Sequence, residues 1–188
     1  MTNVIFTGVG GQGVILAAKI LMDVALRNDH DVKESEIHGM AQRGGSVDCH
    51  VRFGPKVHSP LVKRGTADYI VAFELLEGVH KLEYLAPDGM LIVDRGRIDP
   101  APVQNGKMVY PPDLEEWIRT HISQHLIVNT REELERLKFK KALNIMMLGV
   151  LSRRLDFEQS LWEDSIRALV KSSTVDVNLK VFAQGRSL

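Results

Sequence analysis

The sequence of 188 residues contains a single cysteine, Cys49, and this scarcity excludes several kinds of site. One thiol cannot form a disulfide within the chain, a cysteine-ligated zinc site or an iron–sulfur cluster. Any electron relay is therefore expected elsewhere. Cys49 itself lies in the alternating run Val47-Asp48-Cys49-His50-Val51, where a strand residue is the favoured interpretation and a catalytic nucleophile is the alternative.

Net charge and long apolar runs are also lacking, and the opening residues show no signal-peptide features. The 24 Lys and Arg residues balance the 24 Asp and Glu residues, so charge favours neither nucleic acid nor a membrane as a partner. No apolar run approaches the roughly 20 residues of a membrane-spanning helix. The opening MTNVIFTGVGG has neither a basic segment nor a cleavage site of small residues. We expect a cytoplasmic protein with one domain over residues 1–188.

The apolar pattern predicts an α/β fold, with a three-layer, Rossmann-like sheet that is mostly parallel. An apolar run over 3–8 ends in glycines, and helical spacing begins at Gln12, which indicates a strand, a tight turn and a helix. The Gly-Pro turn signal at 54–55 allows residues 46–53 and 57–62 to pair as an antiparallel hairpin, which would make the sheet mixed. Other strands are expected near Val32 and over 67–73, 90–93 and 107–110.

A further helix is expected over 75–85, and more helices are expected in the second half of the chain. Asp113 as N-cap with Glu116 three positions later resembles a capping box. His121 and His125 have the spacing of helical metal ligands, but no third ligand is near, so solvated or core histidines are the favoured interpretation. The run over 131–141 is typical of a solvated helix face.

The apolar run over 143–151 predicts a buried helix. Two of its residues are unusual for such a helix. A buried Asn144 would need hydrogen-bond partners, and Gly149 would weaken the helix unless it allows close packing.

Gly8-Val9-Gly10-Gly11-Gln12-Gly13 satisfies G-x-G-x-x-G between a predicted strand and a predicted helix. In that setting the glycines let the backbone approach a phosphate, and the helix N-terminus favours its charge. Glu34 follows about twenty residues later, where an NAD site would have its ribose-binding acid. An NAD(P)-dependent dehydrogenase and a non-catalytic nucleotide-binding module are therefore open alternatives. No catalytic group for the dehydrogenase stands out over 54–106.

The stretch 37–45, IHGMAQRGG, has neither helical nor strand periodicity and is expected to form an ordered surface loop. It supplies an apolar side chain, an amide, a guanidinium and two permissive backbone positions, which suit an anionic or carbonyl-bearing group. These are Met40, Gln42, Arg43, Gly44 and Gly45. A glycine-rich turn with an exposed arginine is the alternative, and the residues alone favour neither.

Three segments together resemble a known family: GVGGQGVILAAKIL near the N-terminus, then ESEIHGMAQRGGSVDCHVRFG, then ADYIVAFELLE. They are similar to the gamma-type domain of 2-oxoacid:ferredoxin oxidoreductases, and the form HGMAQRGG resembles the indolepyruvate type more than the pyruvate enzymes. The likeness resumes at 144–149 and fades over 95–140. The charged segment EELERLKFKK is the main departure from the family.

The resemblance implies a reaction shared between subunits. A 2-oxoacid is decarboxylated on thiamine diphosphate, electrons pass through iron–sulfur clusters to ferredoxin, and coenzyme A takes the acyl group. Thiamine diphosphate, its Mg ion and the clusters are expected in a large partner subunit. This chain would then hold no cofactor, metal or catalytic residue by itself. Isolated, it is expected to be inactive and could form a homodimer.

By position, two groups of residues match the family's two loops, and both are expected to converge at the carboxyl edge of the sheet. Arg43, or the helix N-terminus after Gly13, is expected to contact an anionic group of the substrate or of coenzyme A. The first loop comprises Gly8, Gly10, Gly11, Gln12 and Gly13, and the second comprises Met40, Gln42, Arg43, Gly44 and Gly45.

Overall fold

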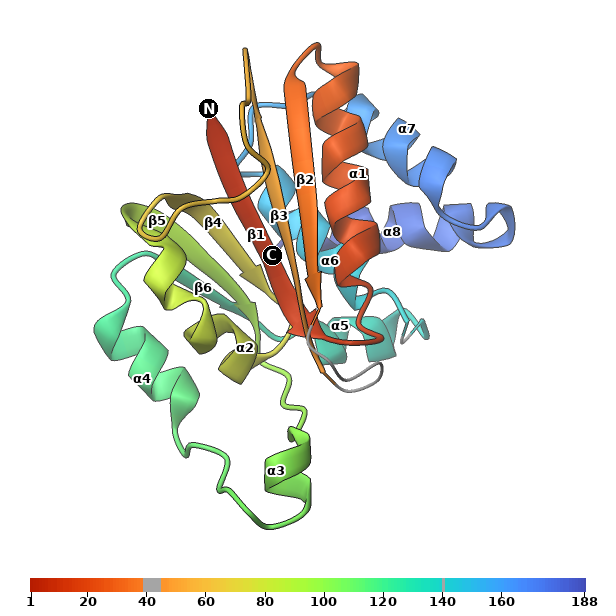
Figure 1. The fold of residues 1–188 in the computed structure, drawn as a ribbon. Helices are drawn as coiled ribbons and strands as arrows, with labels where there is room; N and C mark the ends of the chain where they lie inside the picture. The colour runs from red at the N-terminus through yellow and green to blue at the C-terminus, as the bar shows by residue number, and fades with distance from the viewer. Residues whose placement is uncertain (39–44, 140) are drawn as a thin grey trace.

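The computed structural model describes residues 1–38, 45–139 and 141–188. Within them six strands form one sheet in the order β2-β3-β1-β4-β5-β6 (Figure 1). The strand β3 runs antiparallel to β2 and β1, whereas the pairs from β1 through β4 and β5 to β6 are parallel, so the mixed, mostly parallel sheet is confirmed. The strands are β1 (Thr2–Val9), β2 (Asp31–His38), β3 (Ser46–Gly54), β4 (Ala67–Ala72), β5 (Leu85–Asp94) and β6 (His125–Val128).

Helices cover both faces of the sheet, which confirms the three layers (Figure 1). One face carries α1 (Val14–Arg27), α5 (Thr130–Arg136), α6 (Leu143–Ser152), α7 (Gln159–Leu169) and α8 (Val175–Arg186). The other carries α2 (Leu75–His80) and α4 (Leu114–His121), while α3 (Ala101–Gln104) lies on an excursion that projects from the body. Short 3₁₀ turns cover Leu82–Tyr84 and Ser172–Thr174.

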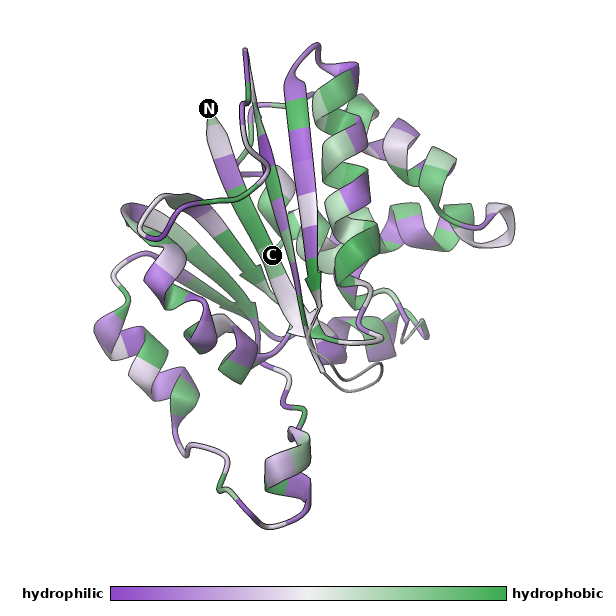
Figure 2. Cartoon of the chain, viewed as in Figure 1, coloured by the Kyte–Doolittle hydropathy of each residue, from purple (hydrophilic) through white to green (hydrophobic). Residues whose placement is uncertain are grey.

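The central strands are apolar on both faces because helices bury both faces. Val4, Ile5 and Phe6 of β1 have no exposed surface, and the same holds for Ile70 and Val71 of β4. In contrast, β2 is largely hydrophilic (Figure 2), as suits a strand at the edge of the sheet.

The predicted hairpin between 46–53 and 57–62 is wrong. Residues 57–62 form no strand, and β3 instead pairs along its length with β2 and β1. The segment after Gly54 packs over β3, where Val62 N–H donates to His50 Nδ1 at 3.1 Å. The largely hydrophilic β2 takes the edge position of the sheet. Because β3 therefore pairs with a strand on each side, it has no free edge for a further strand.

Two other local predictions are wrong, and one strand was not predicted. Residues 107–110 form no strand, and the Val109 side chain is 85% exposed. Asp113 has a left-handed backbone (φ 56°) and its side chain makes no capping bond, so the capping box does not form. His121 ends α4 whereas His125 begins β6, a strand that the sequence pattern did not indicate, so the two imidazoles do not share a helix.

The buried helix over 143–151 is confirmed as α6, and Gly149 has the expected role. A Cβ at Gly149 would lie 2.9 Å from the Cα of Gly185 in α8, so the glycine allows the two helices to pack closely. No helix in the part of the chain that the structure describes is long and apolar enough to cross a membrane.

Candidate functional site

The carboxyl ends of β1, β4, β5 and β6 lie at one edge of the sheet because these strands are parallel. We call this the carboxyl edge, and it comprises the segments that follow these strands: 10–13, 73–74, 95–96 and 129–130. In open α/β sheets, ligands bind outside this edge. The helix α1 also begins here, directly after Gly13.

The turn after β1 presents free backbone donors. Gly11 and Gly13 have left-handed backbones, with φ of 105° and 83°, which favour glycine. Their N–H groups donate to no other described residue. Gly13 is the N-cap of α1 without a side-chain cap, and the first turn of α1 contains no acidic residue. The turn and the helix dipole therefore give a positive potential that suits an anionic group.

Gln12 holds this turn against β4. Its Oε1 accepts the Val9 N–H at 2.7 Å, and its Nε2 donates to the Phe73 carbonyl oxygen, also at 2.7 Å. Gly8 permits this close approach, since a Cβ there would lie 2.8 Å from the Gln12 Oε1 and 3.1 Å from the Phe73 Cβ. The Gln12 amide is thus engaged at both ends within the protein, and its part in the site is to shape the turn.

The second glycine segment, residues 40–45, contacts the turn after β1 through its last residue, Gly45. The Gly10 N–H donates to the carbonyl oxygen of Gly45 at 2.9 Å, and the next pair along the sheet is Val9 with Ser46. Beside this contact is a hollow of about 390 Å³, lined by Val9, Gly10, Gly11, Gly13, Val14, Ile15 and Val47. Met40, Gln42, Arg43 and Gly44 lie outside the described residues, so their contacts stay a prediction.

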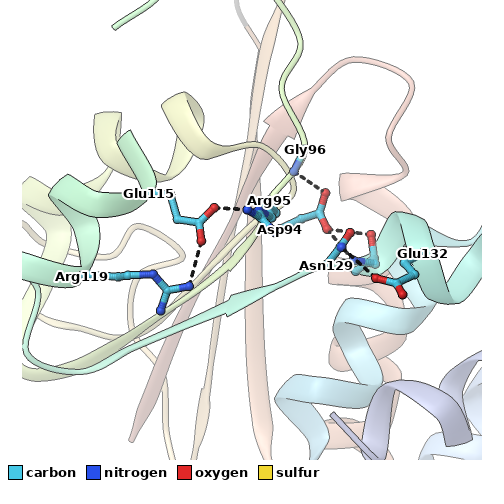
Figure 3. A network of polar contacts seen from close by, with 8 residues as sticks. Asp94, Arg95, Gly96, Glu115, Arg119, Asn129 and Glu132 are labelled. Carbon is cyan, nitrogen blue, oxygen red and sulfur yellow. Dashed lines mark hydrogen bonds and ion pairs between the residues drawn. The ribbon is translucent and has the colours of Figure 1, made fainter. Parts of the chain in front are cut away.

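A buried carboxylate, Asp94, joins the ends of β5 and β6 (Figure 3). Its Oδ1 accepts the Thr130 N–H at 3.1 Å and the Thr130 hydroxyl at 2.6 Å, and its Oδ2 accepts the Gly96 N–H at 2.9 Å. Burial raises the Asp94 pKa, although these three hydrogen bonds act to lower it. The sequence signal for this residue is an acid directly after the apolar run 90–93, and our sequence interpretation did not use it.

The neighbouring Arg95 faces away from this carboxylate and binds Glu115 of α4 at 2.7 Å (Figure 3). Glu115 also binds Arg119 at 2.8 Å. The two arginines are exposed and Glu115 is partly exposed, so these ion pairs contribute little to stability. Between Asp94 and α6 is a second hollow, of about 350 Å³, lined by Asp94, Thr130, Arg131, Leu134, Glu135 and Leu143.

Two further acids are buried under the edge, in the segment after β4. Glu74 is 1% exposed and accepts the Glu77 N–H at 2.9 Å and the Tyr110 hydroxyl at 2.5 Å. Burial, reinforced by Glu74, raises the Tyr110 pKa. Glu77 accepts the Ser46 hydroxyl at 2.5 Å, and burial raises its pKa. These contacts tie the start of β3, next to the second glycine segment, to α2.

Glu34 does not lie at the carboxyl edge. It pairs with Val51, which in turn pairs with Val4 near the start of β1. The glycine turn begins at Gly10, so Glu34 is displaced along the sheet by roughly 20 Å at about 3.3 Å per strand residue. Burial raises its pKa. Its position argues against the ribose contact of a dehydrogenase.

Cys49 is fully buried among the side chains that face α1. Burial raises the pKa of its thiol to about 12, so the reactive thiolate is scarce at neutral pH. The strand interpretation is confirmed, and the nucleophile alternative has no support from this environment.

The presence of a hollow does not by itself identify the carboxyl edge as the functional site. Hollows of about 420 and 410 Å³ lie at the opposite end of the strands, and Tyr69 and Arg154 line both. What distinguishes the carboxyl edge is the combination of free backbone N–H groups, an uncapped helix start and the meeting of both glycine segments.

Comparisons with known proteins agree with one another. A model of the family described as pyruvate ferredoxin/flavodoxin oxidoreductase matches residues 3–188. The indolepyruvate oxidoreductase subunit IorB of Thermococcus kodakarensis is 33% identical over 190 residues, covering 97% of this chain and 93% of that protein.

Two solved structures share the fold. The gamma subunit of a keto/oxoacid ferredoxin oxidoreductase from Geobacter sulfurreducens superposes with a TM-score of 0.72 at 19% identity, covering 100% of this chain and 97% of that one. A 2-oxoglutarate:ferredoxin oxidoreductase from Magnetococcus marinus, with 2-oxoglutarate, coenzyme A and succinyl-CoA bound, superposes with a TM-score of 0.77 at 16% identity. That match covers 99% of this chain and 30% of that one.

Proposed function

We propose, since this chain belongs to the pyruvate ferredoxin/flavodoxin oxidoreductase family, that it is the small subunit of a 2-oxoacid:ferredoxin oxidoreductase of the indolepyruvate type. It acts on an arylpyruvate together with a larger subunit in the cytoplasm. The products are an acyl-CoA, carbon dioxide and reduced ferredoxin. The observation that carries the proposal is the hydrogen bond between Gly10 and Gly45, which brings both glycine segments to one edge.

The large subunit holds thiamine diphosphate with its Mg ion and the iron–sulfur clusters. Bound thiamine diphosphate supplies the carbanion chemistry that releases carbon dioxide, and the clusters carry the electrons to ferredoxin. This chain has one cysteine, which is fully buried, so it does not fit a cluster. Because the large subunit holds the cofactors, the role of this chain is to bind an anionic group and to exclude water.

The glycine turn fits a phosphate or carboxylate. The N–H groups of Gly11 and Gly13 donate to no other described residue, and the first turn of α1 adds further donors and its dipole. Arg43 of the second segment adds a guanidinium that binds such groups in a bidentate manner. We assign these donors to an anionic group of coenzyme A or of the oxoacid. The 390 Å³ hollow beside them is one wall of a pocket that the large subunit completes.

The test is reconstitution with a large subunit of this enzyme type from the same organism. The complex is assayed for oxoacid- and coenzyme A-dependent reduction of ferredoxin with indolepyruvate, phenylpyruvate and pyruvate. We expect turnover with the arylpyruvates by the complex only, and an inactive, colourless chain in isolation. Equal turnover by the large subunit alone, or tight stoichiometric binding of NADH to the isolated chain, would overturn the proposal in favour of a separate nucleotide-binding or dehydrogenase role.

A further inference from the structure

One side chain from the far end of the sequence reaches the glycine turn. Asn144, in the first turn of α6, is 5% exposed, and its Nδ2 donates to the Gly13 carbonyl oxygen at 3.2 Å. The same oxygen accepts the Ala17 N–H at 3.1 Å. Because that is the first hydrogen bond of α1, the amide braces the peptide group at which the turn becomes a helix.

The contact is close enough to fix the turn. A Cβ at Gly13 would lie 2.6 Å from the Asn144 Nδ2 and 2.8 Å from its Cγ, so the amide occupies the space that any other residue at 13 would need. Gln12 holds the turn from the opposite side through the Phe73 carbonyl oxygen. The turn is therefore held between the end of β4 and the start of α6, and its free N–H groups have a defined direction.

An asparagine at this position lowers the stability of the folded protein unless its side-chain amide is hydrogen-bonded. The residues from Asn144 to Ser152 are all buried, and most of them are apolar. A buried amide costs about 1–3 kcal/mol unless it is hydrogen-bonded. The one bond that the described residues provide to its side chain is the bond to Gly13. The polar group is thus best explained by what it does to the turn.

We infer that Asn144 is a positioning residue, which holds the Gly11 and Gly13 N–H groups in the orientation that binds an anionic group of the substrate or of coenzyme A. The inference rests on the proposed function for the identity of the ligand. Asn144 itself touches neither the ligand nor the reacting atoms. It acts through the peptide group of Gly13.

Asn178 provides a matched control. It is 6% exposed, and its Nδ2 donates to the Thr174 carbonyl oxygen at 2.8 Å at the start of α8. Asn178→Ala therefore removes the same kind of buried amide-to-carbonyl bond without a contact to the glycine turn. Asn144→Leu keeps the approximate volume of the side chain and removes the donor without adding a charge, so it separates loss of the bond from creation of a cavity.

The first measurement uses the isolated chain and needs no ligand. Backbone amide hydrogen exchange is followed at Ala17, whose N–H donates to the braced Gly13 carbonyl oxygen. We expect this amide to exchange about fivefold faster in Asn144→Ala and Asn144→Leu, the factor that corresponds to loss of a hydrogen bond worth about 1 kcal/mol. Asn178→Ala should leave its exchange unchanged. Wild-type exchange at Ala17 in both Asn144 variants, or equal acceleration in Asn178→Ala, overturns the bracing role.

The second measurement uses the reconstituted complex. We expect the Asn144 variants to raise the KM for coenzyme A or for the oxoacid about tenfold with a much smaller change in kcat, while Asn178→Ala changes neither. Unaltered KM values in variants that show faster exchange at Ala17 would overturn the link to binding. If the wild-type complex has no oxoacid-dependent activity, the proposed function fails, while the exchange experiment still decides the bracing role.

Discussion

The Gly10 N–H and the Gly45 carbonyl oxygen form a hydrogen bond of 2.9 Å between two glycine segments that are separated by a helix and a strand. This contact brings the end of the second segment beside the turn that precedes α1. The predicted convergence is therefore met at Gly45. The binding roles assigned to the segments stay predictions, and the experiments below address the structural features on which they depend.

Substitution by alanine should destabilise the protein to different extents at Gly11 and at Gly13. Both Gly11→Ala and Gly13→Ala place a side chain at positive φ, which costs about 1–2 kcal/mol. A Cβ at Gly11 meets nothing within 4 Å, whereas one at Gly13 meets Asn144. We expect Gly13→Ala to lower the free energy of unfolding by about 1–3 kcal/mol more than Gly11→Ala does. Urea unfolding of the two variants measures this, and equal losses would contradict the contact.

Gln12→Ala should destabilise the protein by about 1–3 kcal/mol, because it leaves the Val9 N–H and the Phe73 carbonyl oxygen without their partner. Gln104 is the control, since its Nε2 also donates to a backbone carbonyl oxygen, that of Asp99, but at an exposed site. Gln104→Ala should change the unfolding free energy by less than about 0.5 kcal/mol. Similar losses in the two variants would mean that Gln12 does not hold the turn.

The raised pKa of Glu77 predicts a pH-dependent effect of Glu77→Gln. The folded protein retains the Glu77 proton above the ordinary pKa of 4.5, so wild-type stability falls as the pH rises from about 4.5 through the folded pKa. Glutamine does not titrate, so the variant does not lose stability in this pH range, and its side-chain oxygen can still accept the hydrogen bond from the Ser46 hydroxyl. The unfolding free energy of the variant relative to wild type should therefore increase with pH, by about 1.4 kcal/mol per unit of pKa difference. A relative stability that stays constant between pH 4 and 8 would contradict the burial argument.

Cys49 should be inert towards thiol reagents in the native protein, since it is fully buried and burial raises its pKa to about 12. A chromogenic disulfide reagent should release one equivalent of thiolate in urea and react in buffer only at the rate of opening of the protein. The urea sample is the internal control. Fast, complete reaction without denaturant would show that the thiol is accessible and would restore the nucleophile alternative.

The elements that were predictable from the sequence are those with strong apolar patterns. Residues 3–8 and 67–73 are apolar enough to be buried on both faces, and the glycines after Gly8 mark the strand-to-helix turn. The wrong or missing predictions concern segments that are polar or short, or that pair with residues distant in the sequence. The strand pairing of β3 depends on which edge the hydrophilic β2 occupies, and four residues of β6 are too few for a periodicity.

The same distinction applies to the candidate site. The glycine positions could be identified because positive φ and close approach select that residue, as at Gly13. The supporting contacts could not be identified, because they join distant segments. The bond from Asn144 to Gly13 spans 131 positions, and the bond from Thr130 to Asp94 spans 36. Only the three-dimensional arrangement assigns partners to these buried polar groups.

The most direct test of the shared site is amide hydrogen exchange of this chain with and without the large subunit. We expect peptides covering 8–14 and 45–48 to become protected in the complex, because the partner completes a pocket against them. Peptides around Arg154, at the opposite end of the strands, should exchange unchanged. Protection confined to the region of Arg154, with no change at 8–14 and 45–48, would contradict the claim that the two glycine segments form a wall of a shared site.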